Sequence, residues 1–386
     1  MKKTLIALAA LVATGAFAQS NVNFGGVVDV GYRSVTSQTP GGNSNQIANN
    51  GSATSNVTFT GVEDLGGGMK ATLSVTALLG LASPNSLNST PAGWANNTAV
   101  QGAFNYAQFV GLSGGFGTVN LGSPNSVFLA TNAESQPFRT NLGSGYSTGF
   151  GRLTGGGVFF FAGGPVSTNR VVLHEKTIQY VTPKMAGFTG TLEYAAGNDN
   201  NTNRAANTEA MTALGLAYNN GPLNVAASSY TIKAGNNGVA GSVANTTTGL
   251  ATGATANPNA VLPAGATITH NFLAGNYSFG ATTVYAGYTT TKGSGTALND
   301  GKSWNVAAKY MISPSLSVAA NYLKTNESSG VSAAITGSRS LMGAGADYSL
   351  SKRTALYARY EKLDTNTSSD TAGEQTTYMV GVRHAF

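Results

Sequence analysis

The side chains that could do chemistry in this sequence are few and widely spaced. Its 386 residues include 15 acidic residues, 3 histidines and no cysteine. General base catalysis would have to use His174, His270 or His384, and thiol or thiolate–metal chemistry is excluded. No metal-spaced histidine pair or phosphate-binding glycine loop occurs. The spacing Gly-x-Ser-x-Gly is present at 111–115 and 145–149, but the first lies at a turn between two alternating segments and the second in a long polar stretch, whereas a nucleophile elbow needs a strand-to-helix turn. We therefore expect no enzyme, no metal site and no cofactor.

The charged residues instead occupy one side of a repeated pattern. In segments such as 316–322 and 378–386, apolar residues alternate with small or polar ones. Such alternation places neighbouring side chains on opposite faces of a β-strand. Seven charged residues then share the polar face: Asp29, Arg33, Glu193, Lys309, Arg359, Glu361 and Arg383. In a narrow aqueous passage, such a set would act on ions through its combined field.

Sixteen segments carry this alternation, each near the length that crosses a bilayer as a tilted strand. They are residues 22–32, 56–63, 70–79, 104–113, 117–122, 176–182, 190–196, 211–219, 223–232, 267–278, 282–291, 302–312, 316–325, 338–348, 354–363 and 375–386. Their connections alternate between tight turns, such as 63–68, and long polar stretches, such as 33–55 and 233–266. This alternation of short and long connections is typical of outer-membrane barrels, and the architecture of a β-sandwich does not explain it. The sequence predicts an all-β, sixteen-stranded antiparallel transmembrane barrel.

The N-terminus indicates export. Lys2 and Lys3 precede a short apolar run, and Ala16 and Ala18 are the small residues that a signal peptidase reads. We expect a signal peptide over residues 1–18, cleaved after Ala18, and a barrel over 19–386. Removing the two lysines leaves 21 − 2 = 19 basic and 15 acidic residues, a net charge of 19 − 15 = +4. So small an excess argues against nucleic-acid binding.

The long stretch 123–175 differs from the other connections. It contains seven aromatic residues between 128 and 161, and charges at Glu134, Arg139, Arg152 and Arg170. So many aromatic side chains need burial, and the space available in a barrel is the lumen. We expect this stretch to fold inward.

Several motifs resemble the general porins of Gram-negative bacteria, in their β-proteobacterial branch. The turn at 61–71 (GVEDLGGGMKA) is similar to the family's Gly-x-Glu-Asp-Leu-Gly-Gly-Gly-Leu-Lys-Ala turn. Residues 110–119 (VGLSGGFGTV), 180–183 (YVTP) and 380–386 (VGVRHAF) resemble later turns and strands. Each motif is weak alone, but they occur in order and at porin spacing over most of the chain.

The resemblance implies a homotrimeric barrel in the outer membrane, in contact with lipid and lipopolysaccharide. Its third external loop, about 123–175 here, would form a constriction for passive diffusion of small hydrophilic solutes and ions. Phe386 matches the terminal residue that the barrel assembly machinery recognises in the family.

The sequence departs from the family where a ladder of arginines commonly favours anions. Asn56, Tyr106, Asn120 and Ser123 stand at or beside the usual arginine positions. We therefore expect only a weak ion preference.

The candidate pore-lining and constriction residues are Arg33, Glu134, Arg139, Arg152, Lys309, Arg359 and Arg383. Each could instead form a lumen salt bridge or pin the inner loop. Other functions also stay open. The loop aromatics would suit a substrate-specific porin, whereas a surface adhesion barrel would need aromatic-rich outer loops, and those here have almost none beyond Trp94. A few outer-membrane barrels are proteases or lipases, which keeps serine–histidine chemistry as an enzymatic alternative.

Overall fold

The computed structural model describes most of the chain beyond the expected signal peptide. The described residues are 21–37, 43–82, 106–145, 173–174, 176–197, 210–233, 239–240, 261–262, 267–294, 301–327, 337–367 and 374–386. The expected cleavage site after Ala18, the candidate Arg152 and the aromatics from Tyr146 to Phe161 lie outside them.

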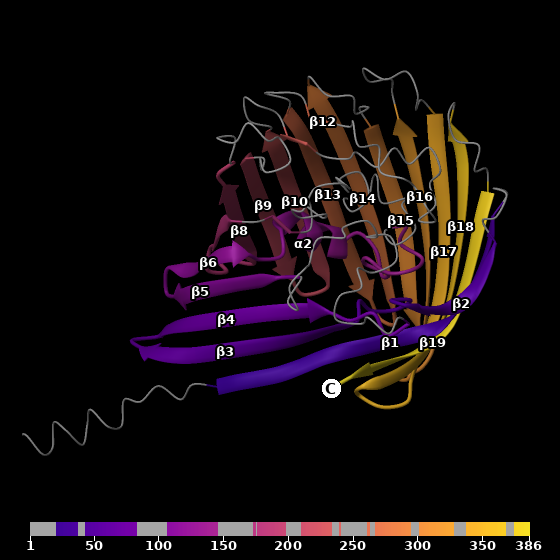
Figure 1. The fold of residues 1–386 in the computed structure, drawn as a ribbon, viewed down its shortest axis with the longest axis horizontal. Helices are drawn as coiled ribbons and strands as arrows, with labels where there is room; N and C mark the ends of the chain where they lie inside the picture. The colour runs from indigo at the N-terminus through magenta and orange to yellow at the C-terminus, as the bar shows by residue number, and fades with distance from the viewer. Residues whose placement is uncertain are drawn as a thin grey trace, which may run out of the picture.

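Sixteen antiparallel strands form one closed wall (Figure 1). They are β1 (Asn21–Ser37), β3 (Asn56–Gly66), β4 (Met69–Leu78), β5 (Gln108–Gly114), β6 (Gly117–Ser123), β7 (Thr177–Val181), β8 (Phe188–Ala195), β9 (Ala210–Asn220), β10 (Leu223–Lys233), β13 (Thr267–Phe279), β14 (Thr282–Ser294), β15 (Gly301–Met311), β16 (Leu316–Glu327), β17 (Gly337–Ser349), β18 (Thr354–Thr367) and β19 (Glu374–Ala385). Each strand pairs with the next, and β19 returns to pair with β1. The wall therefore has no free edge, as a spanning sheet requires.

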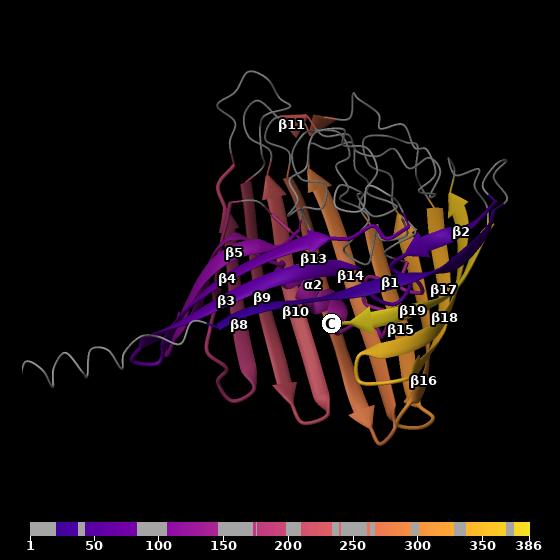
Figure 2. The ribbon, with the colours of Figure 1, turned by 60° about the horizontal axis from the view of Figure 1, so that its bottom comes forward.

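The strands are steeply tilted relative to one another across the barrel. β1, β3 and β4 run at a wide angle to β9 to β16 in both views, and in Figure 2 they cross in front of them, as expected for opposite sides of a barrel (Figures 1 and 2). Most outward side chains are apolar and most inward ones are small or polar, apart from inward apolar residues such as Leu323 and Leu341 that pack on one another inside the barrel. For example, Val318, Tyr322 and Val306 are on the outside, while the intervening Asn305 and Asn321 are buried inside. The outward apolar face and inward polar face predicted from the alternation are confirmed.

Short turns and long connections lie at opposite ends of the barrel. Glycines with positive φ build several turns, including Gly66 to Gly68 between β3 and β4 and Gly221 between β9 and β10. In such turns, glycine adopts the left-handed backbone without a steric penalty. The start of β1 and Phe386 lie on the short-turn side, where the Phe386 N–H donates to the Gly26 carbonyl (3.1 Å) and the Gly26 N–H to the Phe386 carbonyl (3.3 Å).

The structure differs from the predicted elements in four main features. The predicted loop 33–55 contains the end of β1 and an additional strand, β2 (Ser44–Asn49), which pairs with β1. These residues are too polar on both faces to be recognised by alternation. The predicted strand 104–113 begins only at Gln108, and a short helix, α2 (Val127–Ala133), follows β6. A two-residue pairing, β11 (Val239–Ala240) with β12 (Val261–Leu262), was also not predicted.

Strand length varies around the wall. β5, β6, β7 and β8 have 7, 7, 5 and 8 residues, whereas β13 to β18 have 11 to 14. A tilted strand needs about 9–11 residues to cross the apolar layer. The wall from β5 to β8 is thus lower than a lipid-facing wall needs to be. Within the described residues, no helix has the length and apolarity of a membrane-spanning helix.

Candidate functional site: the loop inside the barrel

The connection after β6 turns into the barrel, where α2 lies between the two walls (Figures 1 and 2). Ser126 caps the helix, since its hydroxyl accepts from the Leu129 N–H (3.2 Å). An N-cap of this type satisfies a backbone donor that has no partner within the helix. Residues 125–145 of this connection are called the inner loop below.

The inner loop begins with a buried carboxylate as its anchor. Glu193 on β8 is almost fully buried and accepts from the Val127 N–H (2.7 Å). Gln179 on β7 donates to Glu193 (2.8 Å) and to the Asn125 carbonyl (2.9 Å). Asn120 on β6 donates in turn to the Gln179 side chain (2.8 Å). Three neighbouring strands therefore hold the first turn of α2 against the inner wall.

Aromatic packing fixes α2 further along the wall. Phe128 is 1% exposed, and its ring lies 5.2 Å from that of Phe272 and 6.3 Å from that of Tyr230. The ring of His270 lies 5.9 Å away. Burying such a ring in contact with others stabilises the docked helix beyond its hydrogen bonds. Phe128 is thus a packing residue on the inner face of β10 and β13.

Asparagines on three strands hold the middle of the inner loop. Asn276 on β13 donates to the Glu134 carboxylate (2.6 Å), and Asn305 on β15 donates to the Ser135 carbonyl (2.7 Å). Asn321 on β16 donates to the Gln136 side chain (3.0 Å) and to the Gly143 carbonyl (3.2 Å). The loop therefore follows the inner wall from β7 as far as β16.

A second buried carboxylate ends this path. Glu361 on β18 is 1% exposed, and one of its oxygens accepts from the Gly143 N–H (2.8 Å) and the Gly145 N–H (3.0 Å). Phe138 is 5% exposed and lies under the Arg359 guanidinium, 5.5 Å from the ring centre. Carboxylates therefore anchor both ends of the inner loop on opposite parts of the wall.

Inward-facing glycines make room for the loop. A methyl group at Gly215 would meet Val127, one at Gly287 would meet Ser135, and one at Gly343 would overlap the Gly143 backbone. These glycines lie on β9, β14 and β17. Their positions mark the path of the loop across the wall, where only a hydrogen side chain allows so close an approach.

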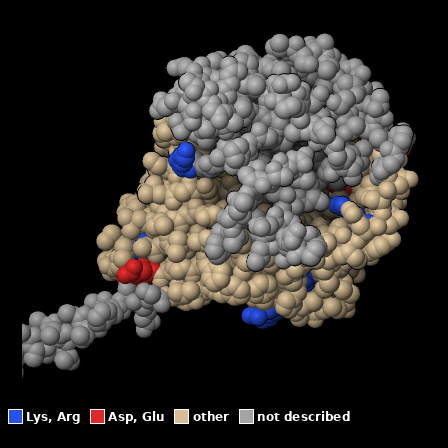
Figure 3. Space-filling view, in the orientation of Figure 1, with Lys and Arg blue, Asp and Glu red and all other residues tan. Residues whose placement is uncertain are grey.

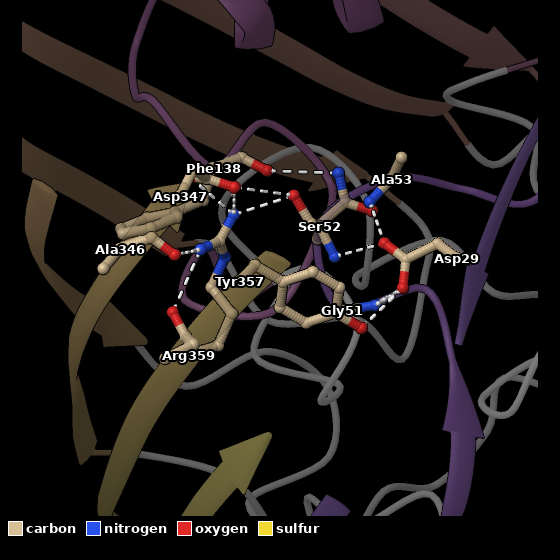
Figure 4. Close-up of polar contacts among 11 residues, drawn as sticks. Asp29, Gly51, Ser52, Ala53, Phe138, Ala346, Asp347, Tyr357 and Arg359 are labelled. Carbon is tan, nitrogen blue, oxygen red and sulfur yellow. Dashed lines mark hydrogen bonds and ion pairs between the residues drawn. The ribbon is translucent and has the colours of Figure 1, made fainter. Parts of the chain in front are cut away.

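A second segment also folds inward. The turn 50–55 lies between β2 and β3, which pair in succession along the same edge of β1. Asp29 on β1 is fully buried, and its carboxylate accepts from the N–H groups of Gly51 (3.2 Å), Ser52 (2.7 Å) and Ala53 (2.6 Å) (Figure 4). The Tyr357 hydroxyl donates to the same carboxylate (2.5 Å). One side chain thus holds the whole turn.

The turn also reaches the opposite side of the barrel seam. Arg359 forms an ion pair with Asp347 (2.8 Å) and donates to the Ser52 hydroxyl (2.8 Å) (Figure 4). Ser52 donates to Asp347 as well (3.1 Å). A small apolar cluster of Ala48, Leu142, Tyr357 and Met379 joins the turn to the end of the inner loop. The two folded-in segments therefore meet over β18.

The predicted site residues divide into two groups. Arg359 is buried and bonded through its two terminal nitrogens to Asp347, Ser52 and two backbone carbonyls, and Glu134 is bonded to Asn276, so these two pin segments to the wall. Arg33, Lys309 and Arg383 are partly exposed on the inner face, and Arg139 is exposed on the inner loop, at a positive φ of 53°.

The inward-facing acidic residues behave differently from the basic ones. Asp29, Glu193 and Glu361 are buried at 0–1% exposure and bonded to backbone N–H groups, and Asp347 is paired with Arg359. The lumen charge that solvent reaches is therefore mainly basic among the described side chains. Among these residues, no group of three His, Cys, Asp or Glu side chains could hold a metal ion.

Two of the residues at which the sequence departs from the family's arginines face the lumen. Asn56 lies on the inner face of β3 and donates to the Thr54 carbonyl (2.8 Å). Asn120 lies on the inner face of β6 and is bonded to Gln179. Tyr106 precedes β5, and its N–H donates to the Thr76 carbonyl (3.2 Å). At these three positions the wall of the barrel therefore carries uncharged side chains.

Most of the residues that anchor the inner loop could not be identified from the sequence. The sequence indicates only polar residues of alternating strands at Asn276, Asn305 and Asn321, and an ordinary loop at 50–55. The three asparagines share one signal, an amide side chain at an inward position of a strand.

The outer surface is consistent with a lipid environment. Figure 3 shows the described surface on this side as almost entirely uncharged, with isolated basic and acidic residues. The model of the Gram-negative porin family matches residues 4–368. The chain belongs to the Gram-negative porin family. It is an outer-membrane β-barrel, and the family resemblance expected from the sequence is confirmed.

Known porins are similar over different shares of the chain. Outer membrane porin protein 32 of Delftia acidovorans is 29% identical over 58% of each chain, and major outer membrane protein P.IB of Neisseria gonorrhoeae is 32% identical over 53% of this chain and 51% of its own. The chain spans about half the length of these curated relatives. An outer membrane porin protein of Bordetella pertussis is 28% identical over the full length of both chains.

Solved porins share the fold. An anion-selective porin from Comamonas acidovorans superposes with a TM-score of 0.69 and 22% identity, covering 95% of this chain and all of its own. OmpF of Salmonella typhi gives a TM-score of 0.66 at 16% identity, covering 95% of this chain and 97% of its own. These likenesses confirm the sixteen-stranded barrel.

Proposed function

We propose that this porin is a water-filled channel for passive diffusion of small hydrophilic solutes and ions. The observation that carries the proposal is the inner loop, which is bonded along the inner wall from β7 to β18 and so narrows the lumen on that side. The inner faces of β3 and β4 oppose it with small polar residues, such as Thr58 and Thr76, whose hydroxyls lie 2.9 Å apart. A passage lined in this way suits hydrated solutes.

The described part of the loop favours a general channel over a substrate-specific one. Stacking on a ligand needs exposed rings, but Phe128 and Phe138 are buried against the wall. We also propose that the protein is not an enzyme, because its three histidines are far apart in the sequence and no catalytic constellation accompanies them.

The ion preference should be weak and directed to anions. The basic groups Arg33, Arg139, Lys309 and Arg383 are accessible, whereas the inward carboxylates are buried in hydrogen bonds. The absence of arginine at Asn56 and Asn120 limits the strength of this field. In a planar bilayer under a KCl gradient, we expect a small reversal potential with the sign of anion selectivity. A cation-selective sign, or a potential as large as that of a strongly anion-selective pore, contradicts it.

The channel activity itself is tested by conductance. Purified protein should give stepwise, ohmic currents, and a folded barrel that gives none would refute the channel. We propose a homotrimer, so the steps should come in threes. The low wall from β5 to β8 supports this assembly, because it is too short to face lipid alone, and OmpT of Vibrio cholerae, a structural neighbour, is described in a trimer form.

The last residue should control assembly. The Phe386 ring packs on the outside of the seam, 5.8 Å from that of Phe24, and its backbone pairs with Gly26. We propose that the barrel assembly machinery reads this residue. Deleting Phe386 should lower the amount of folded barrel in the outer membrane several-fold, measured by heat-modifiable migration on gels, while the periplasmic pool persists. Phe386→Tyr, which keeps the ring, is the control, and normal barrel levels after the deletion count against the proposal.

A further inference from the structure

Two opposite charges of the inner loop lie near one phenol of the wall without pairing with each other. The charges of Glu134 and Arg139 both act on the side chain of Tyr285, an inward residue of β14. Among the described residues, no ion pair joins Glu134 and Arg139. Arg139 is exposed, and Glu134 and Tyr285 are half-buried, so solutes in the lumen reach all three. Opposite charges held apart in this way are both available to a solute that carries the complementary pair.

The strand register adds a third charge, on the short-turn side of the inner loop. Gly287 on β14 is the inward residue next to Ser135, and Tyr285 is the following inward residue towards the turn between β13 and β14. Lys309 on β15 opposes Thr283, which makes it a diagonal neighbour of Tyr285. Diagonal neighbours on a sheet face are about 7–8 Å apart, within reach of long side chains. Lys309 is half-exposed, so two cations and one carboxylate surround this phenol.

A row of asparagine side chains fixes the position of the Glu134 carboxylate. Asn219 on β9 donates to Asn224 on β10 (2.8 Å), and Asn224 donates to Asn276 on β13 (2.9 Å). Asn276 donates in turn to one carboxylate oxygen of Glu134 (2.6 Å). The three amides donate in the same direction, and bonds in such a row strengthen one another. A carboxylate accepts at several sites, so Glu134 can also accept from an ammonium group.

The backbone presents Arg139 to the lumen in an uncommon conformation. Its φ is 53°, in the left-handed region that residues other than glycine rarely adopt. Such strain persists only where the surroundings impose it, and it occurs preferentially at functional sites. Here the Asn132 side chain donates to the Arg139 carbonyl (3.3 Å), and the preceding Phe138 is buried under Arg359. The neighbours of Arg139 are therefore fixed, while its guanidinium extends into the passage.

We propose that Glu134, Arg139 and Lys309 form a lumen subsite for acidic amino acids. Such a solute carries two carboxylates and one ammonium, the complement of two cations and one carboxylate on the protein. Its ammonium lies at Glu134 and its carboxylates lie at Arg139 and Lys309, in charge-assisted hydrogen bonds. A dicarboxylate without the ammonium leaves Glu134 facing a like charge, which disfavours it. The inference rests on the proposed channel and gives it a preference among the solutes that pass.

The test is the block of the KCl current through the full-length protein in a planar bilayer by three solutes. They are L-glutamate, glutarate, which lacks the ammonium, and 4-aminobutyrate, which has one carboxylate. L-glutamate should reach half-block at a concentration about fivefold lower than either of the others, the order expected for one partly exposed charge pair. Equal block by L-glutamate and glutarate overturns the subsite and indicates a site for anions in general.

Single substitutions assign the preference to these side chains. Glu134→Gln keeps an acceptor for Asn276 but removes the charge, so it should abolish the advantage of L-glutamate over glutarate. Lys309→Gln should raise the half-blocking concentration of L-glutamate about fivefold, again the effect of one partly exposed charge pair. Glu374→Gln and Lys302→Gln make the same chemical changes on the outward face and should block like the parent protein.

The outcomes separate a failure of the subsite from a failure of the channel. An unchanged preference for L-glutamate in Glu134→Gln, or equal losses in the outward controls, overturns the subsite while the KCl current persists. A folded barrel without KCl current refutes the channel and the subsite with it. The comparison of the three solutes on the parent protein requires no substitution, so it decides the question even if a variant misfolds.

Discussion

Replacing Glu361 with alanine should release one end of the inner loop and raise the single-channel conductance. The carboxylate accepts two backbone N–H groups, from Gly143 and Gly145, in a buried setting. Leaving both donors without an acceptor costs about 1–3 kcal/mol each. The end of the loop should then leave the wall for a substantial fraction of time, which widens the passage and adds current noise.

The comparison that makes this result specific uses two further variants. Glu361→Gln keeps one carbonyl oxygen as an acceptor and should give a smaller increase. Glu374→Ala removes an outward carboxylate whose salt bridge with Lys362 is solvent-exposed, and such pairs contribute little. It should leave the conductance unchanged. An unaltered current in Glu361→Ala would mean that the other anchors hold the loop without this one.

Replacing Asp29 with alanine should be the most destabilising single change in the described wall. Three N–H groups and the Tyr357 hydroxyl would lose their acceptor at once. By the same cost per buried donor, the total reaches roughly 4 kcal/mol or more. The turn 50–55 would then be free to move into the lumen, so the residual folded channels should also show frequent closures.

Thermal unfolding in detergent, followed by heat-modifiable gel migration or circular dichroism, measures this effect. Asp64→Ala is a suitable control, because Asp64 is an exposed carboxylate in a turn that accepts from the Gly66 N–H (2.9 Å). Its midpoint should shift by much less than that of Asp29→Ala. Equal shifts of the unfolding midpoint in the two variants would show that the hydrogen bonds of turn 50–55 add no more stability than an exposed one.

The strands could be predicted because the bilayer imposes a strict rule on each of them. A spanning strand must be apolar outside, so alternation reports its position and its face together, and Arg33, Lys309 and Arg383 were placed correctly on the inner face. Alternation fails where that constraint stops. β2 is polar on both faces, so it carries no periodic signal.

The site was less predictable, because its contacts join distant parts of the chain. Aromatic content predicted that 123–175 folds inward, and its described part, 125–145, lies along the inner wall, but aromatic content did not indicate which residues hold it there. The bonds from Asn321 to Gly143 and from Glu361 to Gly145 each cross more than 170 residues. Similarly, the burial of Asp29 depends on Tyr357, 328 residues away. Whether a lumen carboxylate attracts cations or holds a backbone turn is decided by these partners, which no local pattern encodes.

The seam between β1 and β19 has a consequence for biogenesis. Val27 pairs with Ala385, and the register continues to Ser37 and Gln375, so the wall closes only through residues at the two extremes of the fold. A chain that ends early would leave two strand edges unpaired, a state that the apolar layer does not tolerate and that favours aggregation. Barrel closure should therefore select for full-length chains, because only a completely translated chain can form a stable barrel in the membrane. Truncated chains should remain accessible to proteases.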